Sequence, residues 1–434
     1  MNRRSLFTLL VVLTVVVGFA AAGLPTYQTA VAQEGEPLKI GLLTDKTSAL
    51  QAYGYELSRG FELGLDYATG GTMTVAGRAI EIVERDNAGD VDTAVEDARV
   101  LIEEEGVELL VGTVSSTVTL NLEATAIENE MILMAGPAAA PAITSDAFNE
   151  FTFRVCRNTF QDAFAIASFA VQEFGPSYII LAADTAFGTG TAAAFDFALQ
   201  ARGAAPVQDT VLVAFDTTDF TNPLTEVLES GADFVVVVWA GSTGVTLVNQ
   251  ATDLGVFDQM GFLQGTDTNY HIAAGNLAIE DTAAYIVYHY TLPDNEINDW
   301  LVEQSQARFE PFLDAYKAYY PGEGEVPGLF TECGFATAQA VVMALEATGG
   351  DTSAAAMIGA LEGLTWQGPK GEYTIRPEDH QALQPMYIIR YVTTAPEEPF
   401  AYFELIEEVS GADAAPPCLA PGRSSENLEC PPAP

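Results

Sequence analysis

The chain has 434 residues, with 60 acidic and 17 basic side chains and a formal net charge of −43. This length suits two or three domains, because a single hydrophobic core stops growing well below it. The negative charge argues against binding to nucleic acid, which needs a basic surface, and against binding to anionic lipid. An acidic surface with four lysines indicates either an ordinary acidic secreted protein or one that stays soluble in a saline habitat.

The first residues have the pattern of a secretory signal. Arg3 and Arg4 precede an apolar stretch over residues 6–22, and Ala30 and Ala32 provide a cleavage site. We therefore expect residues 1–32 to be a signal peptide that exports the protein to the periplasm or the extracellular space. The alternative is an uncleaved N-terminal anchor.

Short apolar runs then alternate with stretches of helical periodicity. Strands are predicted at 38–43, 79–83, 108–111 and 131–134, with helices at 55–68, 93–104 and 115–128. Strands separated by helices of this length form βαβ units with a parallel sheet. The first part of the chain is therefore predicted to be a doubly wound α/β domain.

The same alternation restarts further along the chain. Strands are predicted at 178–181, 207–214, 234–238 and 261–263, with helices at 191–199, 223–229 and 245–254. Beyond residue 283 the order is mixed, with strands at 284–290, 387–392 and 401–406 and helices at 300–319, 333–347 and 354–361. Residues 410–434 are rich in Ala, Pro and Gly and predict a disordered tail.

The four cysteines are Cys156, Cys333, Cys418 and Cys430. An exported chain permits disulfides, and four cysteines allow three pairings. Cys418 and Cys430 lie together in the Pro-rich tail, so a local pair there would leave Cys156 with Cys333. Zinc is the rival interpretation, but the CxxC spacing is absent and histidine is scarce.

The sequence gives no support to an enzyme. The three histidines, His271, His289 and His380, have no nucleophile or metal-like cluster near them in sequence. The run Phe187-Gly188-Thr189-Gly190 lacks the third glycine of a dinucleotide loop and predicts a helix start. We expect no catalytic residue, no metal and no cofactor.

The segment from Gly112 to Thr117 is the most informative one for binding. It joins a buried strand to a helix, so Ser115 and Ser116 are placed to cap that helix. A helix N-terminus at the carboxyl end of a parallel strand is also an anion site, and ligands of open α/β sheets bind there. The segment therefore predicts a site for a ligand carboxylate.

Other candidate site residues follow predicted strands. Tyr53, Phe187 and Trp239 are aromatic, and they either pack in the core or form the walls of one cleft. Asp267 lies in another loop after a strand, where it either binds a ligand amine or caps a helix.

Many short segments, in order, resemble the type I periplasmic binding proteins, of which the Leu/Ile/Val-binding proteins of branched-chain amino acid ABC transporters are examples. The early segments are PLKIGLL at 37–43, AYG at 52–54, RGFEL at 59–63, AIEIVERD at 79–86 and VGTVSS at 111–116. The later ones are YIIL at 178–181, FGTG at 187–190, DFT at 219–221, ADF at 232–234, LEGL at 361–364 and GPKG at 368–371. The resemblance extends over about residues 37–408.

The resemblance implies two Rossmann-like, doubly wound lobes joined by three crossovers, with the ligand between them. Lobe I would comprise residues 38–156 and 284–372, and lobe II residues 157–283 and 383–408. It also implies the extracytoplasmic solute-binding component of an ABC importer, a monomer whose partners are a small-molecule ligand and a membrane permease. The alternatives are a sensing receptor with the same clamp and an exported α/β enzyme.

The resemblance further implies roles for individual residues. Ser116 and its neighbours would hold the ligand carboxylate, Tyr53 would cover the ligand, and Asp267 or Thr266 would meet an amine. In the loop at 136–141, backbone groups of Ala138 and Ala139 would bind the ligand, although Ala139 replaces a threonine of the relatives.

Three further positions bear on the choice of ligand. Phe187 occupies a position where relatives have tyrosine, and Trp239 one where they have another aromatic residue. Arg157 follows a crossover strand and would suit an acid, or would form a salt bridge between the lobes. The changes at Ala139 and Phe187 weaken the assignment to branched-chain amino acids and favour a wider class of amino acids, amides and aromatic acids.

Overall fold

The computed structural model describes residues 35–275, 282–320, 322, 324–392 and 400–420. Residues 36–434 group into one unit. Residues 1–34 lie outside the described part, so the signal peptide stays a prediction. No helix among the described residues is long and apolar enough to cross a bilayer.

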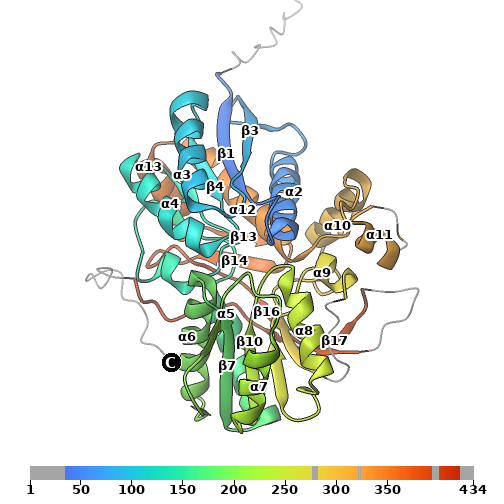
Figure 1. The fold of residues 1–434 in the computed structure, drawn as a ribbon. Helices are drawn as coiled ribbons and strands as arrows, with labels where there is room; N and C mark the ends of the chain where they lie inside the picture. The colour runs from blue at the N-terminus through green and yellow to red at the C-terminus, as the bar shows by residue number, and fades with distance from the viewer. Residues whose placement is uncertain (1–34, 276–281, 321, 323, 393–399, 421–434) are drawn as a thin grey trace, which may run out of the picture. The chain divides into compact units, whose positions relative to one another are not determined.

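A six-stranded sheet forms the first lobe, coloured mainly blue to cyan in Figure 1. Its order is β2-β3-β1-β4-β5-β6, and the neighbours are parallel except β2, which is antiparallel to β3. The strands are β1 (Leu38–Thr44), β2 (Thr74–Val75), β3 (Arg78–Asp86), β4 (Leu109–Gly112), β5 (Leu133–Met134) and β6 (Thr152–Phe153). The helical segments are α2 (Gln51–Ala68), α3 (Val91–Val100), the π-helical turn η1 (Leu101–Glu105), α4 (Ser116–Glu128) and the short 3-10 helix η2 (Pro141–Thr144).

Side chains alternate across this sheet and bury both of its faces. Ile40 and Leu42 of β1 pack with Phe61 of α2, whereas Leu43 packs on the other face with Ala98 of α3 and Leu122 of α4. A strand buried on both faces reads as a continuous apolar run, which is why 38–43 was recognisable in the sequence.

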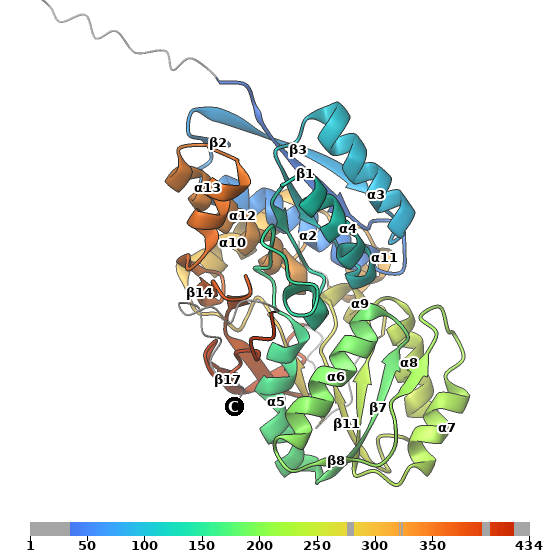
Figure 2. The ribbon, with the colours of Figure 1, turned by 90° about the vertical axis from the view of Figure 1, so that its left-hand side faces the viewer.

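The second lobe repeats this arrangement, coloured green to yellow in Figure 1 and seen from another side in Figure 2. Its parallel strands have the order β11-β10-β7-β8, and β9 also pairs with β7. They are β7 (Ser177–Ala183), β8 (Ala205–Pro206), β9 (Val211–Val213), β10 (Phe234–Val238) and β11 (Gly261–Gln264). Helices α5 (Thr159–Phe174) and α6 (Ala186–Gln200) cover one face, and α7 (Thr221–Glu229) and α8 (Thr243–Asp253) the other.

The last third of the chain joins the lobes. An antiparallel sheet has the order β12-β16-β17, and a second one has the order β13-β14-β15. The strands are β12 (Ala283–Ile286), β13 (Thr365–Gly368), β14 (Gly371–Ile375), β15 (Ala382–Leu383), β16 (Met386–Tyr391) and β17 (Phe403–Val409). The helices are α9 (Asn269–Ala273), α10 (Glu296–Arg308), α11 (Asp314–Tyr319), α12 (Leu329–Thr348) and α13 (Ala354–Leu361). The fold is thus two Rossmann-like lobes joined by three crossovers, as expected.

The residue boundaries of the lobes stay a prediction. The expected division at residue 284 assigns β12 to lobe I. In the structure β12 pairs with β16, and α5 of the second lobe packs against both strands. By these contacts, β12 groups with the second lobe.

Helix α12 returns the chain to the first lobe and packs along α2. A Cβ atom at Gly60 would lie 2.0 Å from the Thr331 carbonyl oxygen, and one at Gly64 would lie 2.4 Å from that of Phe335. Glycine is therefore required on α2 for the two backbones to approach this closely. Figure 1 shows α12 in orange beside α2 in blue, although more than 260 residues separate them.

The helices differ from the predictions in three places. The single helix expected at 300–319 is two helices, α10 and α11, because Pro311 lies between them and cannot continue a helix. Helix α5 was not predicted, although Asn158 and Gln161 form a capping box at its start. Helix α2 also begins at Gln51 rather than near residue 55, so Tyr53 lies within the helix.

The expected disorder of the tail does not hold for its first part. Residues 410–420 are placed, and Ala414 and Pro416 are buried. The Arg376 guanidinium donates a hydrogen bond to the Pro416 carbonyl oxygen at 2.9 Å. Residues 421–434, including Cys430, lie outside the described part, so a disulfide between Cys418 and Cys430 stays a prediction.

A disulfide joins Cys156 and Cys333, which is one of the pairings that the sequence left open. Cys156 follows β6 at the start of a crossover, and Cys333 lies in the second turn of α12. The bond therefore links two segments separated by 177 positions in sequence.

Replacing both cysteines, Cys156→Ser and Cys333→Ser, is expected to lower the free energy of unfolding by about 2 to 5 kcal/mol, because the unfolded chain regains the entropy of a long loop. Urea unfolding of the oxidised protein and the double variant measures this difference. Peptide mapping without reductant should recover Cys156 and Cys333 in one cross-linked species. Recovery of both as free thiols would contradict the assignment.

Glu56 lies at the junction of α2, α9 and α12 and is 1% exposed. Its carboxylate accepts hydrogen bonds from the Thr268 hydroxyl and, at 3.1 Å, from the Phe330 N–H group. Burial raises the pKa of Glu56 to about 8, although these two hydrogen bonds act in the opposite direction. Glu56 is therefore mostly protonated in the folded protein at neutral pH.

Glu56→Gln is expected to weaken the pH dependence of stability. The folded chain keeps a proton that the unfolded chain loses above its ordinary pKa of 4.5. The resulting stabilisation is complete below that value and is lost as pH rises to about 8, at about 1.4 kcal/mol per unit. Urea unfolding at about pH 5 and about pH 8 should show a shallower decline for the variant.

The matched control is Glu62→Gln, at an exposed position on the same helix. This variant should show the same fall in the free energy of unfolding between about pH 5 and about pH 8 as wild type. Some decline should persist in Glu56→Gln, because burial also raises the pKa of Glu123 to about 8. Equal slopes for wild type and Glu56→Gln would show that Glu56 does not carry this proton.

Candidate functional site

A cavity of about 550 Å³ lies between the two lobes. Its lining comes from segments at the carboxyl ends of β1, β3, β4, β5 and β6 in the first lobe and of β7, β9, β10 and β11 in the second, together with β12 and the start of α12. Parallel strands present their carboxyl ends at one edge of a sheet, and ligands of such folds bind there. The volume is within the roughly 300–1,000 Å³ typical of small-molecule sites.

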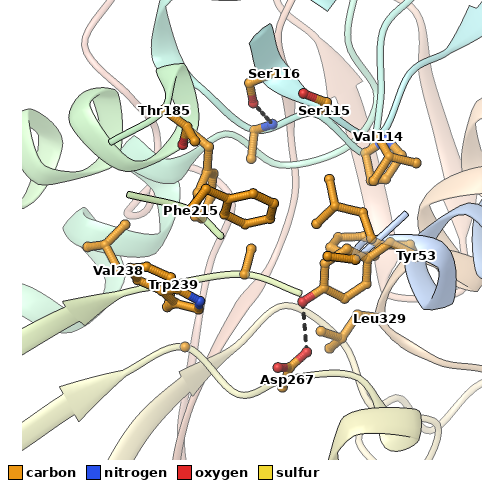
Figure 3. Close-up of a pocket in the computed structure, with 18 of the residues that line it drawn as sticks. Tyr53, Val114, Ser115, Ser116, Thr185, Phe215, Val238, Trp239, Asp267 and Leu329 are labelled. Carbon is orange, nitrogen blue, oxygen red and sulfur yellow. Dashed lines mark hydrogen bonds between the residues drawn. The ribbon is translucent and has the colours of Figure 1, made fainter. Parts of the chain in front are cut away.

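The N-terminus of α4 forms one wall of the cavity (Figure 3). Ser115 is its N-cap, and the Ser115 hydroxyl accepts a hydrogen bond from the Val118 N–H group. The Ser116 hydroxyl accepts hydrogen bonds from the N–H groups of Ala139 and Ala140, both at 3.1 Å. The Ser116 hydroxyl proton takes no part in these two hydrogen bonds, because a hydroxyl has two acceptor positions and a separate proton to donate. The wall thus combines a serine hydroxyl with the electropositive end of a helix.

The loop at 136–140 lies beneath that wall, and the structure separates its two predicted site residues. Ala139 lines the cavity. Ala138 does not, and its N–H group donates to the Thr113 carbonyl oxygen at 3.1 Å. The Ala138 N–H group is thus occupied within the protein, and a ligand contact from backbone groups of Ala138 stays a prediction.

The fully buried Arg154, which sequence analysis missed, holds this loop from behind. Its guanidinium donates to the carbonyl oxygens of Ala140 at 2.7 Å and Ala138 at 3.4 Å, and to the Gln381 side chain at 2.7 Å. Burial lowers the pKa of Arg154 to about 9. The Ala138 carbonyl and the Ala139 N–H group belong to one trans peptide and therefore point in opposite directions. The hydrogen bond from Arg154 to the Ala138 carbonyl oxygen thus orients the Ala139 N–H group toward Ser116.

The second lobe contributes an aromatic wall. Trp239 and Phe215 stack with ring centroids 6.3 Å apart, and the Trp239 indole N–H group donates to the Thr243 hydroxyl at 2.9 Å. Phe187 also lines the cavity, in the first turn of α6. Thr185 is the N-cap of α6, and its hydroxyl accepts a hydrogen bond from the Gly188 N–H group at 3.1 Å. Figure 3 shows Thr185, Phe215 and Trp239 on the same side of the cavity.

Tyr53 and Asp267 lie next to each other on one side of the cavity, joined by a hydrogen bond, as Figure 3 shows. The Tyr53 hydroxyl donates to Asp267 Oδ1 at 2.8 Å and accepts a hydrogen bond from the Gly241 N–H group at 3.0 Å. Burial raises the pKa of Tyr53 well above its ordinary value, so the hydroxyl keeps its proton. The two residues therefore connect α2 of the first lobe to the loop after β11.

His271 is the second partner of Asp267, and no sequence pattern singled it out. Its Nδ1 atom lies 2.8 Å from Asp267 Oδ1. Burial acts to raise the pKa of Asp267, but the His271 charge and hydrogen bonds from His271, Thr268 and Tyr53 outweigh it and lower that pKa. Burial acts to lower the pKa of His271, and Asp267 more than reverses this. The alternative role of Asp267 as a helix N-cap is wrong, because Thr268 is the N-cap of α9.

Arg157 lines the cavity at the start of a crossover. Its Nε atom lies 3.1 Å from Asp162 Oδ2, and its guanidinium lies 5.8 Å from the centre of the Phe330 ring. The ion pair is formed with the first turn of α5, so the expected alternative of a bridge between lobes is replaced by a local pair.

Several lining residues had no prediction of their own. They include Thr185, Phe215, Tyr285, Leu329 and Phe330. Phe330 and Leu329 reach the cavity because α12 returns to α2, which no local pattern announces. Thr266 and Asp267 both line the cavity, and the Thr266 hydroxyl lies 2.8 Å from the Tyr391 hydroxyl. Over the described ranges, no group of three or more His, Cys, Asp or Glu residues could hold a metal ion.

Solved structures share this fold. One is an ABC-type branched-chain amino acid transporter from Rhodopseudomonas palustris CGA009, 32% identical, with a TM-score of 0.73 over 88% of this chain and 99% of that one. Another is the solute-binding protein of an ABC transporter from Rhodopseudomonas palustris BisB5 in complex with 3,4-dihydroxybenzoic acid. It is 21% identical, with a TM-score of 0.74 over 86% of this chain and 98% of that one.

The relatives found by sequence are also binding proteins. The Leu/Ile/Val-binding protein BraC3 of Rhizobium johnstonii is 26% identical, over 50% of this chain and 58% of that protein. The Leu/Ile/Val-binding protein homolog 6 of Brucella melitensis is 23% identical, over 76% of this chain and 82% of that protein. The match to the first of these thus spans less than two thirds of its length. Residues 37–396 match the family described as periplasmic binding protein. The chain belongs to the periplasmic binding protein family.

Proposed function

We propose that the protein is the extracytoplasmic solute-binding component of an ABC importer and captures a small carboxylate-bearing ligand between its lobes. The observation that carries the proposal is the cavity itself. It lies between two parallel sheets, has the volume of a small-molecule site, and has the N-terminus of α4 in its wall. The proposal includes export through residues 1–32, a monomeric state and no catalysis.

The carboxylate preference rests on the wall formed by Ser115, Ser116 and Thr117. The first N–H groups of a helix have no partner within the helix, and its dipole favours a negative charge there. Hydrogen bonds to an ionised carboxylate are about twice as strong as those between neutral groups. An anion site is notable in a chain whose net charge is −43, because it has to arise locally. Backbone groups supply it without a surplus of basic side chains.

The aromatic wall supports a ligand with an apolar or aromatic body. Phe187, Phe215 and Trp239 offer faces on which such a body can pack. The relatives bind solutes of this kind, since one is a branched-chain amino acid transporter protein and another holds 3,4-dihydroxybenzoic acid. We therefore propose amino acids, amides and aromatic acids as the class to be screened.

The proposed mechanism is hinged capture. The ligand binds one lobe, the second lobe closes over it, and a membrane permease recognises the closed form. The hydrogen bond between Tyr53 of the first lobe and Asp267 of the second supports a closed arrangement of the lobes. Closure excludes water, which strengthens the hydrogen bonds to the carboxylate.

A thermal-shift screen of the mature protein tests the proposal. Amino acids, amides and aromatic acids are added in turn, and at least one acid should raise the melting temperature, because a ligand that binds only the folded state stabilises it. If no small molecule raises the melting temperature, the proposal is wrong.

Ser116→Ala tests the carboxylate wall. The variant should weaken the binding of any acid found in the screen by about tenfold to a hundredfold, the value of a charged hydrogen bond. Isothermal titration calorimetry measures the change. The control is Ser242→Ala, at the exposed N-cap of α8 and outside the cavity lining. Unchanged affinity in Ser116→Ala would remove Ser116 from the site.

A further inference from the structure

Asp267 is an acid of the cavity wall, and its Oδ1 atom contacts three groups of the described part of the chain. The Tyr53 hydroxyl donates to it at 2.8 Å, the Thr268 N–H group donates at 2.7 Å, and His271 Nδ1 lies at 2.8 Å. The side chains of Asp267 and His271 are 9% and 5% exposed. The carboxylate is thus held by the protein before any ligand contacts it.

His271 is the group placed to offset the Asp267 charge, since burial acts to lower its pKa and the Asp267 charge more than reverses this. It lies four residues further along, on α9, and its ring packs edge-on against Tyr53 with centroids 5.5 Å apart. The other acid that faces it is Glu56 of α2, which burial keeps mostly protonated at neutral pH by raising its pKa to about 8. A protonated His271 therefore pairs with Asp267 alone, and the pair is neutral overall.

The other buried charge in the lining is also compensated. Arg157 forms an ion pair with Asp162, 3.1 Å apart, and the second acid that lines the cavity, Asp184, is exposed. The N-terminus of α4 adds a field that favours an anion. Among the described residues that line the cavity, the acids are Asp184, which is exposed, and Asp267, which has His271 beside it.

The charge balance of the lining decides between two kinds of acid that the cavity could bind. A simple carboxylic acid brings one negative charge, which the α4 N-terminus can hold. A 2-amino acid brings an ammonium group as well, and a buried ammonium needs an anion to offset its lost hydration. A neutral His271–Asp267 pair does not provide that anion.

We propose that His271 neutralises Asp267 within the cavity wall and thereby sets the ligand class as carboxylic acids that carry no ammonium group. This inference rests on the proposed function and narrows it. His271 is a specificity-determining residue in this view, although its ring acts through Asp267.

Matched probes test the inference by isothermal titration calorimetry at neutral pH. The pairs are 3-phenylpropanoate with L-phenylalanine and 4-methylpentanoate with L-leucine, which differ by the ammonium group alone. In whichever pair fits the cavity, wild type should bind the acid without the ammonium group at least about tenfold more tightly than the corresponding amino acid. His271→Gln keeps a hydrogen-bonding side chain but no charge, so the ratio should move toward the amino acid by about tenfold or more.

A double variant shows whether the effect passes through Asp267. In His271→Gln combined with Asp267→Asn, the uncompensated charge is gone, and the preference should return to that of wild type. The control His289→Gln removes a buried histidine outside the cavity lining and should leave the ratio unchanged. Melting temperatures confirm that each variant is folded.

A pH series provides a second readout. As pH rises through the pKa of His271, which lies above its ordinary 6.5, Asp267 loses its counter-charge and the amino acid should gain affinity relative to its partner. Glu56→Gln serves as the background, because Glu56 titrates in a neighbouring range. The shift should vanish in His271→Gln.

Tighter binding of the amino acids by wild type, or an unchanged ratio in His271→Gln, would overturn the inference and leave the proposed function standing. If no acid binds, with or without an ammonium group, the proposed function and the inference fail together.

Discussion

The close packing of α2 against α12 is the constraint on which the cavity depends. Gly60 and Gly64 let the two backbones approach, and this approach brings a segment from beyond residue 328 to the early part of the chain. Tyr53 and Glu56 from α2 then lie beside Phe330 from α12. A side chain at Gly60 would separate these groups, and with them one rim of the cavity. The packing of α2 against α12 therefore also positions the residues that form this rim of the cavity.

Three buried charges near the cavity each have polar or charged partners. Arg154 gives its hydrogen bonds to carbonyl oxygens and a glutamine, Arg157 pairs with Asp162, and His271 pairs with Asp267. Each ion is matched by polar groups of its own lobe or of the adjoining crossover, as the cost of burying an unpaired charge requires. The large negative charge of the chain therefore belongs to its surface, while the cavity is governed by helix ends and closed pairs.

The regular parts of the fold could be predicted from the sequence because their determinants are local. The apolar runs at 38–43 and 234–238 are strands buried on both faces, and Ser115 caps α4 as its position suggested. Elements whose pattern was interrupted or overlooked were missed, such as the helix break at Pro311 and the capping box at Asn158.

The site could be predicted only in part. Ser116, Trp239 and Asp267 were found because they follow strands whose carboxyl ends share an edge. Ala138 and Ala139 are neighbours of the same type in sequence, and only the course of the loop shows that one lines the cavity and the other turns away. His271 and Arg154 act through partners that tertiary structure brings to them, so no spacing in the sequence announces them.

The Cys156–Cys333 disulfide has a consequence for how the lobes can move. It fastens the start of the first crossover to α12, so residue 156 is a fixed point of the first lobe. Rotation of the second lobe about this crossover has to begin beyond residue 156, in the short stretch before α5 that carries Arg157. If the lobes close as proposed, the pivot and the Arg157 guanidinium are neighbours in the chain, and the rotation would reorient the guanidinium by the same motion.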